Sequence, residues 1–273
     1  MKNYKHKTVE TSKFLKKHIK KLPQIGFITG TGLGESSNFI DVSMSFEYED
    51  IPHFPTSTVE SHYGMLLFGE IRDKQIMVMQ GRFHLYEGYS PLEVTFPIRV
   101  MQELGVHTLI LSNAAGGLNP GFNTGDIMIV SDHINLTGSS PLIGPNEELW
   151  GIRFPDMNAA YDKGLMELAK KAGKDEGIHL QKGVFVGLKG PSLETPAEVR
   201  FLRTIGADAV AFSIIQEVLV AIHAGIKVLC LSTITNVHDP DRPVPATVEE
   251  IIAVAEQTAP KLEAIIRNVI EKD

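Results

Sequence analysis

The sequence predicts an α/β fold in which a central β-sheet lies between helices. Short apolar runs that are typical of strands alternate along the chain with segments of helical periodicity. Several of these runs are almost entirely apolar, as expected for strands that are covered on both faces. The 273 residues, 43% of them hydrophobic, are enough for a large core. Because no repeat or low-complexity tract interrupts the pattern, we expect one domain over residues 1–273.

The alternation assigns each element in turn. Strands are expected at residues 25–29, 65–69, 75–80, 108–112, 126–130, 184–188, 208–212 and 227–233. Helices are expected at residues 91–104, 159–172, 195–205, 216–224 and 248 to about 270. Residues 138–155 are rich in Gly, Pro and Asn and predict a long ordered loop. Loops of this length in compact proteins are usually functional.

Two of the predicted helices carry explicit start signals. Thr195 is followed by Pro196 and Glu198, and Thr247 is followed by Glu250, so that each pair of Thr and Glu can form a capping box. Apolar residues recur at helical spacing in the last helix, which predicts a buried face. Its expected members are Val248, Ile251, Ile252, Ala255, Ala259, Leu262, Ile266 and Val269.

The N-terminal segment is strongly basic, with eight lysines up to residue 21 opposed only by Glu10. Apolar residues interleave with these lysines, so we expect an amphipathic first helix with a solvated basic face. The alternative is an arm that binds nucleic acid or a membrane. The net charge of −7 over the whole chain argues against nucleic-acid binding, which needs a basic face.

The remaining composition indicates a cytoplasmic protein. The single cysteine, Cys230, lies in an apolar run and has no partner for an internal disulfide. We expect no signal peptide, because the N-terminal segment has no apolar core. No stretch approaches the ~18 consecutive apolar residues of a transmembrane helix.

Residues 81–89, Gly-Arg-Phe-His-Leu-Tyr-Glu-Gly-Tyr, form the most informative motif. They follow an apolar predicted strand, whose packing does not require a cation, an imidazole and a carboxylate at its end. The guanidinium of Arg82 can bind an oxyanion through two parallel N–H bonds. His84 and Tyr86 continue the same side of an extended chain. The motif predicts an anion site beside a polar organic substrate; the alternative is a surface loop with solvated charges.

Polar groups also follow five other predicted strands. The loop Gly-Thr-Gly-Leu-Gly at 30–34 presents backbone N–H groups and the Thr31 hydroxyl, although it matches neither a P-loop nor a dinucleotide fingerprint. Small residues at 112–117 let a ligand lie against the backbone. Glu194 precedes a helix N-terminus, which stabilises its charge, and Ser213 and Asn236 end further strands. Each loop alone is equally well a tight turn, but their convergence at strand ends predicts a ligand site.

Together these segments resemble the trimeric purine nucleoside phosphorylases, over about residues 10 to 270. The matching motifs are 30–34, 81–89, 112–117, Asp-His-Ile-Asn at 132–135, Gly-Pro-Asn at 144–146, Arg-Phe-Pro at 153–155, 190–198 and Thr-Asn at 235–236. The resemblance implies a mixed central sheet flanked by helices, and a homotrimer. It also implies phosphate-dependent cleavage of purine nucleosides to free base and ribose 1-phosphate. Inorganic phosphate is then a co-substrate, and no metal, organic cofactor, nucleic acid or membrane takes part.

The resemblance also implies a role for each matching residue. The expected phosphate ligands are Thr31, His62, Arg82, His84, Ser213 and, through its backbone, Ala114. The expected neighbours of the nucleoside are Tyr86, Asn113, Leu193, Glu194, Phe212, Asn236, Val248 and, reaching in from a neighbouring subunit, Phe154. Glu194, Asn236 and His84 are the expected catalytic residues.

The chemistry of Glu194 and Asn236 suits a 6-oxopurine. An ionised Glu194 can accept from N1–H of hypoxanthine or guanine and would repel the lone pair on N1 of adenine. Asn236 can donate to N7 or O6 of the base and so stabilise the negative charge that develops on the departing purine. We therefore expect inosine and guanosine to react faster than adenosine.

Three positions depart from the family pattern. Leu193 stands where an aromatic residue is usual, Phe212 makes the ribose wall bulkier, and Val248 stands where a histidine would meet the ribose 5′-hydroxyl. An apolar residue at the last position resembles methylthioadenosine phosphorylases, which favours 5′-deoxy or 5′-methylthio nucleosides of a 6-oxopurine as substrates. Alternatively His238 or another residue of its loop contacts the 5′-hydroxyl. A third possibility is a nucleoside-binding homologue without turnover.

Overall fold

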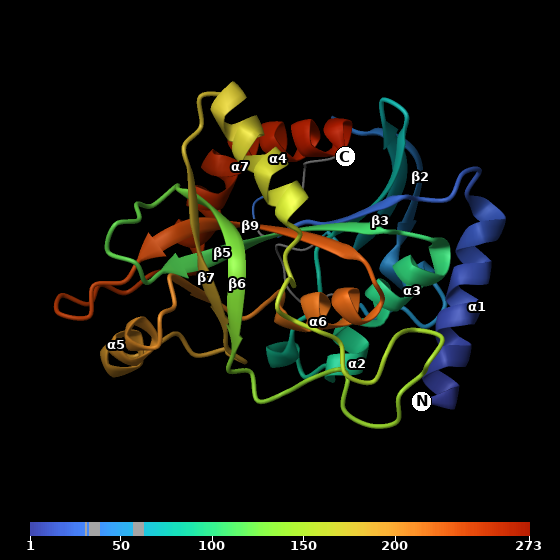
Figure 1. Ribbon diagram of the computed structural model, residues 1–273, viewed down its shortest axis with the longest axis horizontal. Helices are drawn as coiled ribbons and strands as arrows, with labels where there is room; N and C mark the ends of the chain where they lie inside the picture. The colour runs from blue at the N-terminus through green and yellow to red at the C-terminus, as the bar shows by residue number, and fades with distance from the viewer. Residues whose placement is uncertain (31, 33–38, 57–62) are drawn as a thin grey trace.

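The computed structural model describes residues 1–30, 32, 39–56 and 63–273, and within them the chain forms a mixed nine-stranded sheet flanked by helices (Figure 1). The predicted α/β class is confirmed. The strands are β1 Ile25–Ile28, β2 Asp41–Glu47, β3 Met65–Ile71, β4 Lys74–Gln80, β5 Thr108–Gly117, β6 Ile127–Asn135, β7 Leu180–Gly187, β8 Ala209–Ala211 and β9 Lys227–Val237. Their order in the sheet is β2-β3-β4-β1-β5-β8-β7-β6-β9.

Strand β5 organises the sheet. It pairs in parallel with β1 on one side and with β9 on the other, and its last two residues also pair with β8. Because β9 returns to β5, the strands β5, β8, β7, β6 and β9 close on themselves. The remaining strands extend as an open sheet that ends at β2. The closed part therefore brings the ends of several strands around one small region.

Both faces of the sheet are buried, which explains the nearly continuous apolar runs. Successive residues of a strand point to opposite faces, and the two apolar clusters follow that alternation. In β1, Phe27 belongs to one cluster and Ile28 to the other; in β9, Leu229 and Cys230 are divided in the same way. Buried Cys230 is thus a core residue, as predicted.

The helices cover the two faces unequally. Figure 1 shows α4 and α7 together over one face, with α2, α3 and α6 on the other and α1 packed beside α3. The helices are α1 Lys2–His18, α2 Pro91–Val94, α3 Phe96–Leu104, α4 Lys163–Asp175, α5 Pro196–Thr204, α6 Ile215–His223 and α7 Val248–Lys272. In α1, Leu15 is buried while Lys13, Lys16 and Lys17 are exposed, as an amphipathic helix requires. Among the described residues, no helix combines the length and apolarity needed to cross a bilayer.

Both capping boxes are present as predicted. The Thr195 side chain accepts from the Glu198 N–H and the Thr247 side chain from the Glu250 N–H, each at 3.2 Å. The predicted buried face of the last helix is correct for its later turns but wrong for Val248, which is 67% exposed. Val248 is the first residue of α7, and the buried residues of this helix begin only at Ala255.

Three other elements differ from prediction. Strand β2 was not expected; it is an edge strand with no buried residue, so the apolar signal was weak. The helix expected at 91–104 is divided at Thr95, because Pro97 lacks the N–H that would continue α2 into α3. The helix expected at 159–172 begins only at Lys163, where Asp162 caps its first turn.

The cap of α7 provides a test of the fold. Replacing Thr247→Ala removes the acceptor for the Glu250 N–H, and we expect the free energy of unfolding to fall by about 1 kcal/mol. Urea denaturation followed by circular dichroism measures this change. Thr247→Ser keeps the hydroxyl and should retain most of the stability; equal loss in both variants would contradict the assigned cap.

Candidate active site

A cavity of about 370 Å³ lies where strands β1, β4, β5, β7, β8 and β9 end or pass into loops. It is the meeting point of segments that are distant in sequence. Its lining residues include Gly30, Arg82, His84, Tyr86, Asn113, Ala114, Gly116, Leu193, Glu194, Phe212, Ser213, Thr235, Asn236, His238, Ala246, Val248, Ile251 and Ile252. Arg82 and Glu194 therefore open onto the same cleft.

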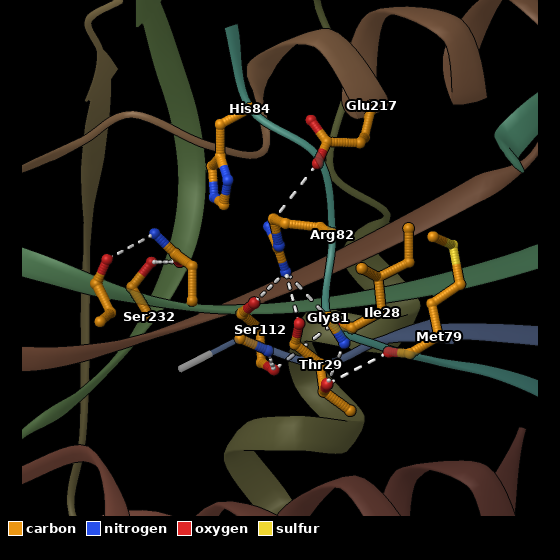
Figure 2. A network of polar contacts seen from close by, with 12 residues as sticks. Ile28, Thr29, Met79, Gly81, Arg82, His84, Ser112, Glu217 and Ser232 are labelled. Atoms are coloured by element: carbon orange, nitrogen blue, oxygen red, sulfur yellow. Dashed lines mark hydrogen bonds and ion pairs between the residues drawn. The ribbon is translucent and has the colours of Figure 1, made fainter. Parts of the chain in front are cut away.

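Arg82 is the only buried cation that lines the described part of this cavity. Arg82 follows β4, and its guanidinium is directed toward the end of β1 and toward Ser112 of β5 (Figure 2). There Nη2 donates to the carbonyl oxygens of Ile28, at 3.3 Å, of Thr29, at 3.4 Å, and of Ser112. Backbone carbonyls thus orient the guanidinium while it remains 2% exposed.

A buried carboxylate accompanies Arg82. Glu217, in the first turn of α6, places Oε1 3.7 Å from Nη1 of Arg82, and both side chains are buried (Figure 2). Helix N-termini stabilise negative charge, and the guanidinium supplies the opposite charge that a buried carboxylate requires. The pair keeps a fixed cation at the cavity wall.

His84 is oriented by its own turn. The Glu87 carboxylate accepts from the His84 backbone N–H, at 2.8 Å, and lies 2.9 Å from Nδ1. A carboxylate partner places the proton on Nδ1. The imidazole also stacks on Tyr86 with ring centroids 4.6 Å apart. Burial raises the pKa of Tyr86 to about 12, so its phenol remains neutral and able to donate a hydrogen bond.

Ser213 lies at a strained turn between β8 and α6. The Ile215 N–H donates to the Ser213 carbonyl at 2.9 Å, and Ile214 between them has φ of 64°. A positive φ is unusual for a β-branched residue, and such strain is concentrated at functional sites. The turn places Ser213 on the cavity wall at the start of α6.

The backbone approaches closely where β1 meets β5. A Cβ at Gly30 would lie 2.6 Å from Cα of Asn113, so only glycine fits there. The Gly30 N–H donates to Oγ of Ser112 at 3.1 Å. The Asn113 Oδ1 in turn accepts from Ser232 at 2.7 Å. These contacts fix the small-residue segment of β5 against which a ligand can lie.

Asn236 and Glu194 are the other polar residues expected at the site. Oδ1 of Asn236 accepts from Thr235 at 3.4 Å, and in the described part of the chain no acceptor takes its amide N–H groups, so these can donate into the cavity. The Glu194 side chain is 2% exposed. Burial raises its pKa above the ordinary value of 4.5, and the charge of Glu198 adds to this effect.

An apolar wall closes another part of the cavity. It consists of Ala246, Val248, Ile251 and Ile252, from the segment that precedes α7 and from its first turns. Phe212 packs edge-on against Tyr86, with centroids 6.1 Å apart. Leu193 also lines the cavity and is half exposed.

The structure brings together most of the residues singled out from the sequence. Arg82, His84, Tyr86, Asn113, Ala114, Leu193, Glu194, Phe212, Ser213, Asn236 and Val248 all line this cavity. Thr31 and His62 lie outside the described residues. Phe154 does not contribute to the cavity of its own chain; it is 84% exposed on the loop between β6 and α4.

Sequence reasoning missed the residues that support the site. Glu87 stood inside the 81–89 motif, three residues after His84, and that spacing was an available signal. Glu217 had no comparable signal, because only the fold brings α6 beside Arg82. His238 was considered for a 5′-hydroxyl, but its nearest charged partner is Glu194, 3.4 Å away.

Comparison with known proteins agrees with this geometry. The model of the phosphorylase superfamily matches residues 24–271. Purine nucleoside phosphorylase 1 of Bacillus subtilis is 50% identical over 257 residues, covering 94% of this chain and 95% of its own length.

Solved structures extend the likeness to the fold. Schistosoma mansoni purine nucleoside phosphorylase in complex with adenosine has a TM-score of 0.93 and 39% identity, covering 100% of this chain and 97% of that one. The same enzyme with inosine has a TM-score of 0.91 and 39% identity, covering 98% and 96%. The chain thus belongs to the phosphorylase superfamily and, within it, to the purine nucleoside phosphorylases.

Proposed function

We propose that this chain cleaves 6-oxopurine nucleosides, such as inosine and guanosine, with inorganic phosphate, releasing free base and ribose 1-phosphate. The observation that carries the proposal is the shared cavity, which has a fixed guanidinium, Arg82, and a buried carboxylate, Glu194, in its wall. These groups are complementary to an oxyanion and to an N1–H donor. The likeness to purine nucleoside phosphorylases supports the same activity.

Phosphate binds at the 81–89 segment. Arg82 supplies the main charge, His84 and Ser213 supply donors, and the backbone of Ala114 completes the contacts on the β5 side. Thr31 and His62 are the remaining predicted ligands. Holding the dianion in place converts its encounter with the sugar into an intramolecular reaction, which is a large rate advantage.

The nucleoside occupies the rest of the cavity. Tyr86 and Phe212 border the ribose, and Glu194 accepts from the N1–H of the base. A phosphate oxygen bonds to the anomeric carbon as the bond to the purine breaks, and the purine leaves with the electron pair and then takes up a proton. Asn236 donates to N7 or O6 and stabilises the charge as it appears. No electron is transferred to an acceptor, and the reaction uses no metal or organic cofactor.

A second candidate concerns the 5′ end of the substrate. The wall formed by Ala246, Val248, Ile251 and Ile252 is entirely apolar. His238, the alternative contact for a 5′-hydroxyl, lies instead beside Glu194. These two observations favour acceptance of 5′-deoxy and 5′-methylthio nucleosides of a 6-oxopurine.

The active form is a homotrimer that acts in the cytoplasm. The loop between β6 and α4 exposes five large apolar residues, Leu136, Ile143, Leu149, Ile152 and Phe154. Exposed apolar groups gathered on one loop are typical of an interaction surface. In the trimer, Phe154 of one subunit reaches the nucleoside of the next.

The first prediction tests the activity and its base. The protein should release hypoxanthine from inosine only when phosphate is present, and should prefer inosine over adenosine by as much as ~10⁴-fold in kcat/KM. Glu194→Gln replaces the charged acceptor for N1–H by a neutral amide, which can also donate to N1 of adenine. The kcat/KM for inosine should therefore fall about 10- to 100-fold and the preference over adenosine should narrow. Spectrophotometry of base release measures both.

Glu198→Gln, on the exposed first turn of α5, is the matched control and should leave the preference unchanged. Binding of inosine without phosphate-dependent release would instead indicate a non-catalytic homologue.

The second prediction tests the apolar wall. Wild-type kcat/KM for 5′-methylthioinosine should equal or exceed that for inosine. Val248→His introduces a donor for the 5′-hydroxyl and should shift the ratio toward inosine by about tenfold, whereas Val248→Ala should not. A strong wild-type preference for inosine would refute the 5′-apolar hypothesis.

The third prediction tests the trimer. Light scattering should give three times the chain mass of 30.0 kDa. Phe154→Ala should lower kcat/KM for inosine at least about tenfold, because an aromatic anchor is lost from the neighbouring site. Leu22→Ala removes a similarly exposed apolar side chain elsewhere and should have no effect. A fully active monomer would rule out the proposed role of Phe154.

A further inference from the structure

His238 lies against the carboxylate that is proposed to read the base. Its Nε2 is 3.4 Å from Oε2 of Glu194, and its side chain is 17% exposed against 2% for Glu194. Both residues line the cavity, and both also line a wider hollow that adjoins it. His238 is therefore within reach of a bound purine and of Glu194 at once.

The backbone holds His238 in this position. The His238 N–H donates to the carbonyl of Gly117 at 2.9 Å, which extends the pairing between β9 and β5 by one residue. Nη2 of Arg203 donates to the His238 carbonyl, and Nε of Arg203 donates to the carbonyl of Leu118. Arg203 belongs to α5, the helix that directly follows Glu194 in the chain. Its hydrogen bond to the His238 carbonyl therefore links His238 to the segment that carries Glu194.

The imidazole itself has a dedicated space. A Cβ at Gly116 would lie 2.5 Å from Nε2 and 3.1 Å from Cδ2 of His238. Any side chain at Gly116 would therefore displace the ring. The absence of a side chain there leaves room for the imidazole, whose Nε2 lies 3.4 Å from Oε2 of Glu194.

His238 is also the partner that Glu194 requires. Within the described residues, no Lys or Arg nitrogen lies within 4.0 Å of the Glu194 carboxylate, and His238 is the sole basic group that does. Burial lowers the pKa of His238, with Arg203 adding to the effect, so the imidazole is neutral at neutral pH. A neutral imidazole can still donate one N–H, and a buried carboxylate is destabilised without such a donor.

We infer that His238 is a positioning residue for base recognition: its Nε2–H is directed to Oε2 of Glu194, which leaves Oε1 for N1–H of the purine and disfavours a 2-amino group. This inference rests on the proposed function of Glu194. In guanine, N1–H and the 2-amino N–H are adjacent donors that pair best with both oxygens of one carboxylate. Since His238 occupies one carboxylate oxygen of Glu194, guanine cannot pair both of its donors with this carboxylate. The affinity for guanine relative to hypoxanthine is therefore lower than it would be with both oxygens available.

The test compares inosine and guanosine binding in three forms of the full-length protein. Calorimetry in phosphate-free buffer gives both dissociation constants without turnover. In His238→Leu, Oε2 loses its donor, and the affinity for guanosine relative to inosine should rise about tenfold, the equivalent of one hydrogen bond to a charged group. In His238→Gln, the amide nitrogen replaces Nε2, and the ratio should stay at its wild-type value.

Two further variants complete the design. His238→Asn carries a shorter amide that does not reach Oε2, so it should behave as His238→Leu and replaces it if the leucine variant does not fold. His179→Leu removes an exposed histidine outside the cavity and should leave the ratio unchanged.

An unchanged ratio in His238→Leu and His238→Asn would overturn the inference, as would equal shifts in His238→Gln and His238→Leu. Because binding is measured without phosphate, this result is independent of turnover. A shifted ratio in a protein that does not release hypoxanthine would uphold the role of His238 and reject only the proposed reaction.

Discussion

The in-register parallel pairing of β5 with its neighbours is the constraint on which the site depends. Ile28 of β1 pairs with Leu111 of β5 and with Met79 of β4, and Leu111 pairs with Cys230 of β9. Strands β1 and β4 therefore end at nearly the same level, whereas β5 and β9 continue beside each other to Gly117 and Val237. This register brings Arg82, which follows β4, and Asn236, near the end of β9, to one region although the chain separates them widely. A slip of one residue would turn the apolar side chains of a strand to the opposite face, so burial on both faces fixes the register.

That region carries buried charge, and the fold compensates it by two different means. Arg82 is held by carbonyl oxygens at the end of β1 and within β5 and faces Glu217, so its position does not depend on a ligand. Glu194 has much weaker compensation, a neutral imidazole at 3.4 Å. A ligand that donates an N–H to Glu194 therefore forms a hydrogen bond with a carboxylate that the protein itself compensates only weakly. The fixed positive charge of Arg82 on one side is complementary to an oxyanion. The weakly compensated carboxylate of Glu194 on the other side is complementary to the N–H of a purine base.

Part of the cavity wall is apolar. Val248, Ile251 and Ile252 line it without offering a side-chain donor, and Nε2 of His238 lies 3.4 Å from Oε2 of Glu194. One short segment, from the end of β9 to the first turns of α7, thus supplies both the apolar wall and the histidine beside Glu194.

Much of this molecule could be predicted from local sequence. Eight of the nine strands in the described residues were expected, because burial on both faces leaves continuous apolar runs; the exception, β2, is an exposed edge strand. The capping boxes at Thr195 and Thr247 were also predictable, since each depends on residues three apart. Likewise the 81–89 motif indicated an anion site, because its charged and aromatic side chains have no role in a core.

The sequence by itself determined the apolar periodicity, the caps and the identity of the polar groups at each strand end, because these are properties of neighbouring residues. Only the tertiary structure decided which buried groups face one another. The fold brings Glu217 of α6 beside Arg82 and places Val248 on the cavity wall and not in the core. It also leaves room at Gly116 for the ring of His238 beside Glu194. Such contacts join segments far apart in the chain, and they depend on strand order and register, which no local pattern encodes.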